Sequence, residues 1–182
     1  TVFKDELKIP VIALSDYTLP EYVNEKTLFI ASSYSGNTEE TLSSVVDAQQ
    51  KKAKIAGICS GAKLGKFLTE NDYPALIFEP KYTPNKSPRM GLGYSIFGQM
   101  ALLAKLGVLP VSEQDYDQVM EAVATAQLSF NRHIETSENP AKMLAYNFIS
   151  RIPIVTAAEH LEGAVHVFAN QLHENAKNYA EF

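Results

Sequence analysis

The chain lacks the residues that build disulfide-stabilised or thiolate-metal proteins. Cys59 is its single cysteine among 182 residues, so within the chain neither a disulfide framework nor a cysteine zinc site can form. No stretch approaches the roughly 18 continuous apolar residues of a membrane span, and the first residues show no leader pattern. Acidic and basic residues are interleaved with a formal net charge of −5, which predicts no binding of nucleic acid or of an anionic membrane. A reducing cytoplasm fits these absences.

What is present is an ordinary globular composition, 46% hydrophobic and 20% charged. Short apolar runs closed by Gly, Pro, Ser or Asn predict buried strands at residues 9–14, 28–32, 55–59 and 75–78. Helical patterns follow at residues 39–52, 62–71 and 91–106. Because strands and helices alternate, the sequence predicts an α/β fold with a doubly wound parallel sheet.

A second unit is expected after a linker at residues 107–110. Ser112 is a candidate helix cap with Asp115 in the first turn, and apolar residues repeat at helical spacing behind it. The patterns predict helices at residues 112–132, 139–148 and 159–178, and a strand at residues 152–157. We therefore expect two domains, residues 1–108 and 109–182.

One strand-to-helix corner carries a cluster of hydroxyl groups. Ser33, Ser35 and Thr38 lie between the strand at residues 28–32 and the following helix, and Gly36 allows backbone to approach a ligand closely. A helix N-terminus offers unsatisfied N–H groups and a partial positive charge, so it attracts phosphate without needing Lys or Arg. The corner thus predicts an uncharged phosphate-binding site at the carboxyl end of a strand.

The same residues have a simpler interpretation. Ser, Gly, Asn and Thr are also common turn and cap residues, and Asn37 and Glu40 stand in capping-box register. Tyr34 could line a ligand pocket or merely pack beside the turn.

The run SYSGNTEET at residues 33–41 resembles the motif of SIS (sugar isomerase) domains. DYTLP at 16–20, SPRMG at 87–91 and NQLHENAK at 170–177 are similar to segments of the bifunctional phosphoglucose/phosphomannose isomerases. The resemblance implies two flavodoxin-like SIS subdomains per protomer, the second truncated here, in a homodimer without metal or organic cofactor. It implies interconversion of glucose 6-phosphate or mannose 6-phosphate with fructose 6-phosphate through an enediolate.

The resemblance also assigns roles to residues. Glu174 would be the catalytic base and Arg89 the charge stabiliser, while Ser33, Ser35 and Thr38 would bind the substrate phosphate. Tyr34, Gly36 and Asn37 would line the substrate. Without the resemblance, Glu174 would be a solvated helix residue pairing with Lys177, and Arg89 a surface loop arginine. The chain departs from the family at His173, where Asn usually precedes the base.

The resemblance further implies that the family's glycine-rich turn precedes Thr1 and that its catalytic histidine and a threonine follow Phe182. We therefore expect an incomplete site and an inactive chain by itself. Two rival functions remain: a non-catalytic sugar-phosphate-binding SIS module, and an isomerase domain of the amidotransferase type. The four histidines show no metal-ligand spacing, and the segment 61–66 departs from a P-loop in spacing and in Phe67.

Overall fold

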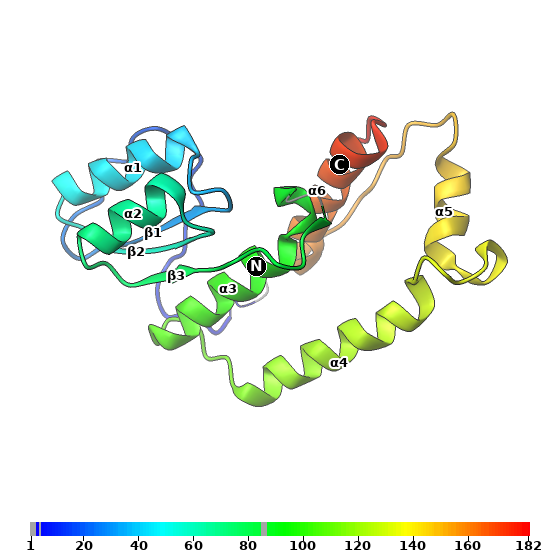
Figure 1. Ribbon diagram of the computed structural model, residues 1–182, viewed down its shortest axis with the longest axis horizontal. Helices are drawn as coiled ribbons and strands as arrows, with labels where there is room; N and C mark the ends of the chain where they lie inside the picture. Colours follow the sequence, from blue (N-terminus) through cyan, green and yellow to red (C-terminus); the bar gives the residue numbers. More distant parts are fainter. Residues whose placement is uncertain (1–2, 4, 85–86) are drawn as a thin grey trace. The chain divides into compact units, whose positions relative to one another are not determined.

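The computed structural model describes residue 3 and residues 5–84 and 87–182, and it forms two compact units. One unit is Leu7–Leu109, and the other is Pro110–Phe182 with the first described residues up to Glu6 (Figure 1). The assignment of either unit to a whole SIS subdomain stays a prediction.

The unit Leu7–Leu109 is built on a parallel sheet of three strands in the order β1-β2-β3. The strands are β1 (Leu28–Ser33), β2 (Lys54–Cys59) and β3 (Ala75–Ile77). Leu28 pairs with Lys54 and Ser33 with Cys59, so β1 and β2 end together. The expected α/β class with a parallel sheet is confirmed.

Helices α1 (Glu39–Gln50), α2 (Ala62–Glu70) and α3 (Leu92–Lys105) connect and follow the strands. Side chains alternate between the faces of a strand, so Ile55 and Ile58 of β2 lie on opposite faces of the sheet and pack against different helices. Ile55 joins the buried cluster with α1 and α2 residues. On the other face, a Cβ added at Gly98 of α3 would lie 2.3 Å from Ile58 Cδ1. Helices therefore cover both faces, α1 and α2 on one and α3 on the other (Figure 1).

The strand expected at residues 9–14 is absent, so that prediction is wrong. The segment has no regular secondary structure, and Ile9 and Val11 are 50% and 58% exposed. An apolar run becomes a strand only when a neighbouring backbone takes its ladder hydrogen bonds. No strand pairing of these residues is found in the part of the chain that the structure describes.

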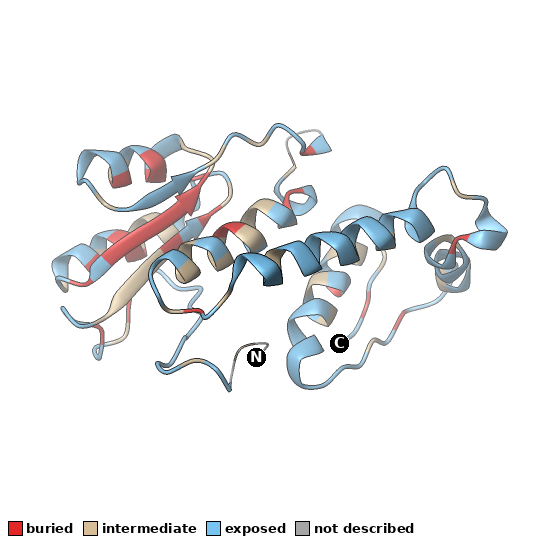
Figure 2. Ribbon diagram, turned by 90° about the horizontal axis from the view of Figure 1, so that it is seen from below, coloured by how far each residue is buried: buried red, intermediate tan, exposed pale blue. Residues whose placement is uncertain are grey.

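The unit containing Pro110–Phe182 is helical. Its helices are α4 (Glu113–Phe130), α5 (Pro140–Phe148) and α6 (Glu162–Gln171), the last preceded by a short 3-10 helix and followed by a π-helical turn, Leu172–Ala176. The predicted cap is confirmed, because Ser112 and Asp115 form a reciprocal capping box. No described side chain of α4 or α5 is buried, as Figure 2 shows by its colours.

In place of the strand expected at residues 152–157, the structure has one isolated parallel bridge between Ile154 and Glu181. The Val155 N–H donates to the Glu181 carbonyl, and the Glu181 N–H donates to the Pro153 carbonyl, both at 2.9 Å. A longer strand would need further backbone partners on either side of Glu181. The prediction of a full strand is therefore wrong, although the segment is extended and pairs in the expected parallel sense.

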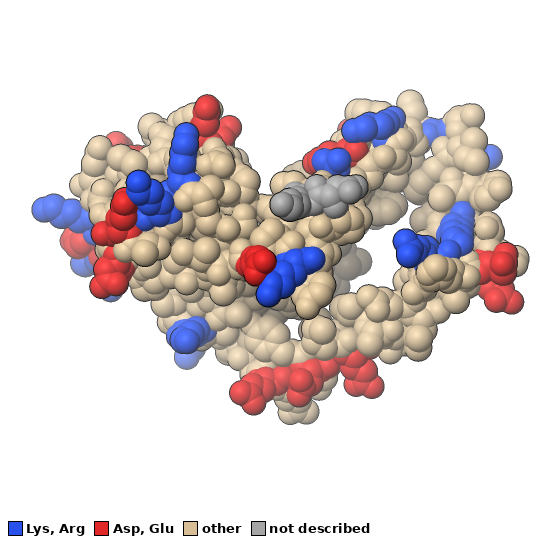
Figure 3. All heavy atoms as spheres, in the orientation of Figure 1, with Lys and Arg blue, Asp and Glu red and all other residues tan. Residues whose placement is uncertain are grey.

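The surface carries charges of both signs. On the face drawn in Figure 3, lysines and arginines alternate with acidic residues, and a row of acidic side chains lies along α4. None of the helices in the described part of the chain combines the length and apolar character needed to cross a membrane.

Candidate functional site

The candidate phosphate loop lies where β1 runs into α1. Ser33 is the last residue of β1, and Thr38 is the residue that caps α1. Thr38 has extended backbone angles, φ −62° and ψ 120°, and its side chain accepts no capping hydrogen bond. The first-turn amides of α1 are therefore not occupied by a side-chain cap, which leaves donors directed out of the helix end.

This geometry differs from the simple capping interpretation of the loop. Asn37 and Glu40 would form a capping box if Asn37 were the cap, but the helix begins one residue later. The backbone N–H of Asn37 instead donates to the Ser35 hydroxyl at 3.2 Å. The loop is thus ordered by its own short hydrogen bonds while the helix end stays open.

Two of the predicted hydroxyl ligands are linked to each other. Ser33 is 5% exposed, and its Oγ accepts the Gly36 N–H at 3.0 Å. Its second bond, 2.8 Å long, joins it to Thr38 Oγ1. When Ser33 donates in this bond, the exposed Thr38 keeps its own hydroxyl proton for a ligand. Ser33 then shapes the loop, and Thr38 and the exposed Ser35 are the hydroxyls that can reach an anion.

The loop is fixed against the start of α2 through its backbone. Gly36 has φ of 73°, and its carbonyl accepts the Leu64 N–H at 2.9 Å. The Ser60 N–H donates to the Tyr34 carbonyl, also at 2.9 Å. A Cβ added at Gly36 would lie 2.0 Å from the Gly61 carbonyl oxygen. Only glycine fits there, because both the dihedral angle and the space exclude a side chain.

Tyr34 joins the loop to the segment that carries Arg89. Its hydroxyl bonds to Thr83 Oγ1 at 2.7 Å, and its ring meets Phe78 edge-on with centroids 5.4 Å apart. A Cβ added at Gly91 would lie 2.3 Å from Tyr34 Cε2. Arg89 lies in the 3-10 helix Pro88–Met90, directly before Gly91, and is exposed. The structure thus brings the loop and the arginine segment together across more than fifty residues of sequence.

Glu174 lies in the π-helical turn Leu172–Ala176 of the other unit. The turn ends at Lys177, which has φ of 55°. The sequence periodicity predicts an uninterrupted helix over residues 159–178. In the structure the α-helix ends at Gln171 and continues as a π-helical turn to Ala176. Such turns are rare and occur often at functional sites, because they widen the helix and redirect side chains.

His173, the residue that departs from the family motif, is used structurally. Its Nε2 lies 3.0 Å from both the amide and the carbonyl of Ala180. Its ring stacks on Tyr179 with centroids 5.6 Å apart. The histidine therefore fastens the segment after the π turn back onto it, beside Glu174.

The predicted site residues are divided between the units. Glu174 belongs to the unit of Pro110–Phe182, and the others belong to Leu7–Leu109. The sequence does not predict that Thr83 and Gly91 contact Tyr34. The proline-rich character of residues 80–88 indicates only a loop. Among the described residues, no group of three or more His, Cys, Asp or Glu is placed to hold a metal ion.

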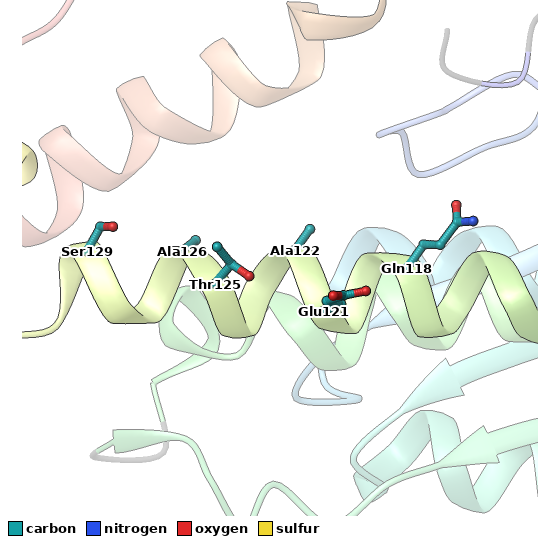
Figure 4. A pocket seen from close by; sticks show the side chains of 6 residues that line it. All are labelled: Gln118, Glu121, Ala122, Thr125, Ala126 and Ser129. Carbon is teal, nitrogen blue, oxygen red and sulfur yellow. The ribbon is translucent and has the colours of Figure 1, made fainter.

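A hollow elsewhere on the surface contains none of the predicted residues. It follows one face of α4 (Figure 4). Its lining comes from that helix alone: Gln118, Glu121, Ala122, Thr125, Ala126 and Ser129. Because no second element contributes a side chain, it presents no converging polar groups of the kind that a ligand site needs.

Several known proteins are similar to this chain. Residues 137–182 match the model of the bacterial phospho-glucose isomerase C-terminal SIS domain. The chain is 36% identical to a bifunctional phosphoglucose/phosphomannose isomerase of Caldicellulosiruptor bescii, over 98% of this chain and 52% of the relative. A protein of the same description from Thermoplasma volcanium is 32% identical over 76% of this chain and 46% of its own length. The chain is therefore an SIS-type protein.

Over nearly its whole length it is similar to the bifunctional phosphoglucose/phosphomannose isomerases, and its last 46 residues match the SIS-domain model of the bacterial phospho-glucose isomerases. A D-glucosamine-6-phosphate 4-epimerase of Sulfolobus acidocaldarius is also related, at 32% identity over 88% of this chain and 48% of its own length. The chain spans about half the length of the curated relatives that it matches.

Proposed function

We propose that the chain is part of an aldose–ketose isomerase that interconverts glucose 6-phosphate or mannose 6-phosphate with fructose 6-phosphate. The observation that carries the proposal is the open N-terminus of α1, where Thr38 caps the helix without a side-chain capping bond. This feature lies within the SYSGNTEET run that first suggested a phosphate site.

The phosphate would bind without a basic side chain in the loop. The partial positive charge of the α1 N-terminus and its outward amides attract an anion. The Thr38 and Ser35 hydroxyls add donors, and Gly36 keeps backbone close to the ligand. Tyr34 and Asn37 would line the sugar beyond the phosphate.

The chemistry that we propose moves one proton between C1 and C2 of the open-chain sugar. Glu174 takes the proton from one carbon and returns it to the other, while the negative charge of the enediolate develops on the oxygens. Arg89 would stabilise that charge. The π turn around Glu174 and the packing of the Arg89 segment on Tyr34 support these roles.

We also propose the finer organisation that the family implies. The two units would be a first SIS subdomain, residues 1–108, and part of a second, residues 109–182. The protein would act as a homodimer in the cytoplasm, with no metal or organic cofactor.

Two alternative functions can be distinguished from the isomerase, one by the sugar phosphate that binds and the other by the absence of proton exchange. The epimerase relative favours a hexosamine 6-phosphate as an alternative ligand, because it matches nearly as much of this chain. A non-catalytic sugar-phosphate module would bind the same phosphate but exchange no proton. Proton exchange at C2, followed in deuterated solvent with the full-length protein, separates the isomerase from such a module.

The phosphate site can be tested with the chain itself by titration calorimetry. Glucose 6-phosphate is expected to bind, and unphosphorylated glucose is the matched control that should not. Thr38→Ala should weaken binding by about 1 to 3 kcal/mol, the range for a hydrogen bond to a charged group, whereas Thr38→Ser keeps the hydroxyl and should bind nearly normally. Unchanged affinity in Thr38→Ala would remove Thr38 from the site.

A further inference from the structure

Residues 16–21, which we term the strap, run beside α1 and are bonded to its middle and to its C-terminal end. The Ser44 hydroxyl donates to the Asp16 carbonyl. One turn further along α1, the Asp47 carboxylate accepts the Leu19 N–H at 2.7 Å. The last contact is an ion pair of 3.4 Å between Lys51 and Glu21.

These contacts form one stripe on the helix. Positions 44, 47 and 51 follow the spacing of a single helix face. Nearer the phosphate loop, the charge of Glu40 in the first turn of α1 raises the pKa of the half-exposed Tyr17 phenol. The bonds of the strap hold α1 from its middle to the residue that follows its last turn.

The strap is itself anchored in the core. Leu19 is 5% exposed and belongs to the buried cluster that includes Val45 and Ala48 of α1. The side chains that α1 buries are small, namely Ser44, Val45 and Ala48. Of the larger side chains of α1, the half-buried Leu42 packs against the same cluster. The hydrogen bonds of the strap add directional contacts to this apolar packing.

The placement of α1 matters for the phosphate site because its first-turn amides point along the helix axis, out of the N-terminus. A shift or tilt of the helix would move these donors relative to the Ser35 hydroxyl and the rest of the loop. We propose that the strap positions α1 for phosphate binding, and that Ser44 and Asp47 are positioning residues for that site. The inference rests on the proposed phosphate site, and neither residue is expected to touch the ligand.

Asp47 is the stronger of the two positioning residues. Its bond to the Leu19 N–H is part-buried and has a charged acceptor, which makes it stronger than a bond between neutral groups. Asp47→Asn retains an acceptor oxygen for that N–H, whereas Asp47→Ala removes it. For Ser44, Thr keeps the hydroxyl and Ala removes it.

The test measures the dissociation constant for glucose 6-phosphate by calorimetry on the whole chain, with thermal unfolding of every variant recorded first. Gln49→Ala is the matched control, because Gln49 also ties α1 to another segment through Asn71 at 2.9 Å and Tyr73 at 3.1 Å, but away from the strap. Binding is measured at a temperature at which all compared variants are folded.

We expect Asp47→Ala and Ser44→Ala to weaken binding by about threefold or more, a typical effect of residues that act through others. Asp47→Asn and Ser44→Thr should retain much of the affinity, and Gln49→Ala should leave it unchanged. If the alanine variants do not fold, the single variant Tyr17→Phe is measured in their place and should weaken binding, whereas Asp47→Asn should bind nearly as tightly as the wild type.

Two results would overturn the inference. Folded strap variants that bind as tightly as the wild type would show that the strap does not position the site. Equal weakening by Gln49→Ala would show that any loosening of α1 has the same effect. Absence of binding by the wild-type chain is a different outcome, because it would refute the proposed phosphate site and the inference with it.

Discussion

The sharpest prediction concerns Gly36, where the phosphate loop meets the start of α2. Gly36→Ala adds a single methyl group, and that group would lie 2.0 Å from the Gly61 carbonyl oxygen. The obstacle is backbone, so no side-chain rotation can relieve it. The loop must shift away from α2, which stretches the bond from the Leu64 N–H to the Gly36 carbonyl, now 2.9 Å long.

The cost has three parts, and the dihedral part can be measured separately. Left-handed backbone costs a residue with a Cβ about 1 to 2 kcal/mol. Loss of the backbone hydrogen bond adds about 1 kcal/mol, before the steric term. Gly107 is a matched control in the same unit, since its φ is 72° against 73° for Gly36 and nothing lies within 4 Å of its added Cβ.

The assay is urea unfolding of Gly36→Ala, Gly107→Ala and Gly93→Ala, followed by calorimetric titration with glucose 6-phosphate. Gly107→Ala should lose only the dihedral cost and bind normally. Gly93 is the second residue of α3 and has just one distant neighbour, Phe97 at 4.0 Å, so Ala there should stabilise by less than the about 0.5 to 1 kcal/mol gained in the middle of a helix. Gly36→Ala should be the least stable and should lose phosphate affinity. Equal destabilisation by Gly36→Ala and Gly107→Ala would refute the steric argument.

Three other predictions follow from single residues. In the full-length protein, Glu174→Gln should reduce kcat by on the order of 10² to 10⁴ with little change in KM, and solvent deuterium should no longer enter C2; exchange at the wild-type rate would assign the base elsewhere. Burial raises the pKa of the Cys59 thiol, so a thiol reagent should label it only as the unit unfolds, and rapid labelling of the native chain would contradict its buried position. The hydrogen bonds from the side chain and backbone of Ser112 lower the pKa of Asp115 below the ordinary aspartate range. They therefore stabilise α4 at pH values above that range, and this stabilisation is lost as pH falls through the lowered pKa. Asp115→Asn should therefore flatten the acid dependence of helicity measured by circular dichroism, and an unchanged curve would argue against the capping box.

The fold of the first unit could be predicted because its signals are local. The apolar runs of β1 and β2 and the periodicity of α1 are properties of adjacent residues, and they gave the correct elements to within a few positions. The run at residues 9–14 carries an equally strong signal, yet it forms no strand. Sequence specifies the tendency to extend, whereas a strand also needs a partner that no local pattern identifies.

The candidate site was predictable in composition but not in geometry. Hydroxyl residues at a strand-to-helix corner indicated the loop, and the family resemblance indicated Arg89 and Glu174. The packing of Tyr34 between Thr83 and Gly91 depends on tertiary contacts, and the π turn around Glu174 has no residue pattern that distinguishes it from a regular helix.

The N-terminus of α1 is capped differently from that of α4. A threonine at the N-cap position of a helix normally accepts a hydrogen bond from a first-turn amide, which contributes about 1 kcal/mol to stability. Thr38 does not do so, because its hydroxyl is bonded to Ser33 instead. A loop selected only for stability would use that hydroxyl as a cap, and the second unit does so with Ser112. The open helix end at Thr38 therefore sacrifices a local interaction that the same chain makes elsewhere, and an anion held by the free amides is the interaction that would replace it.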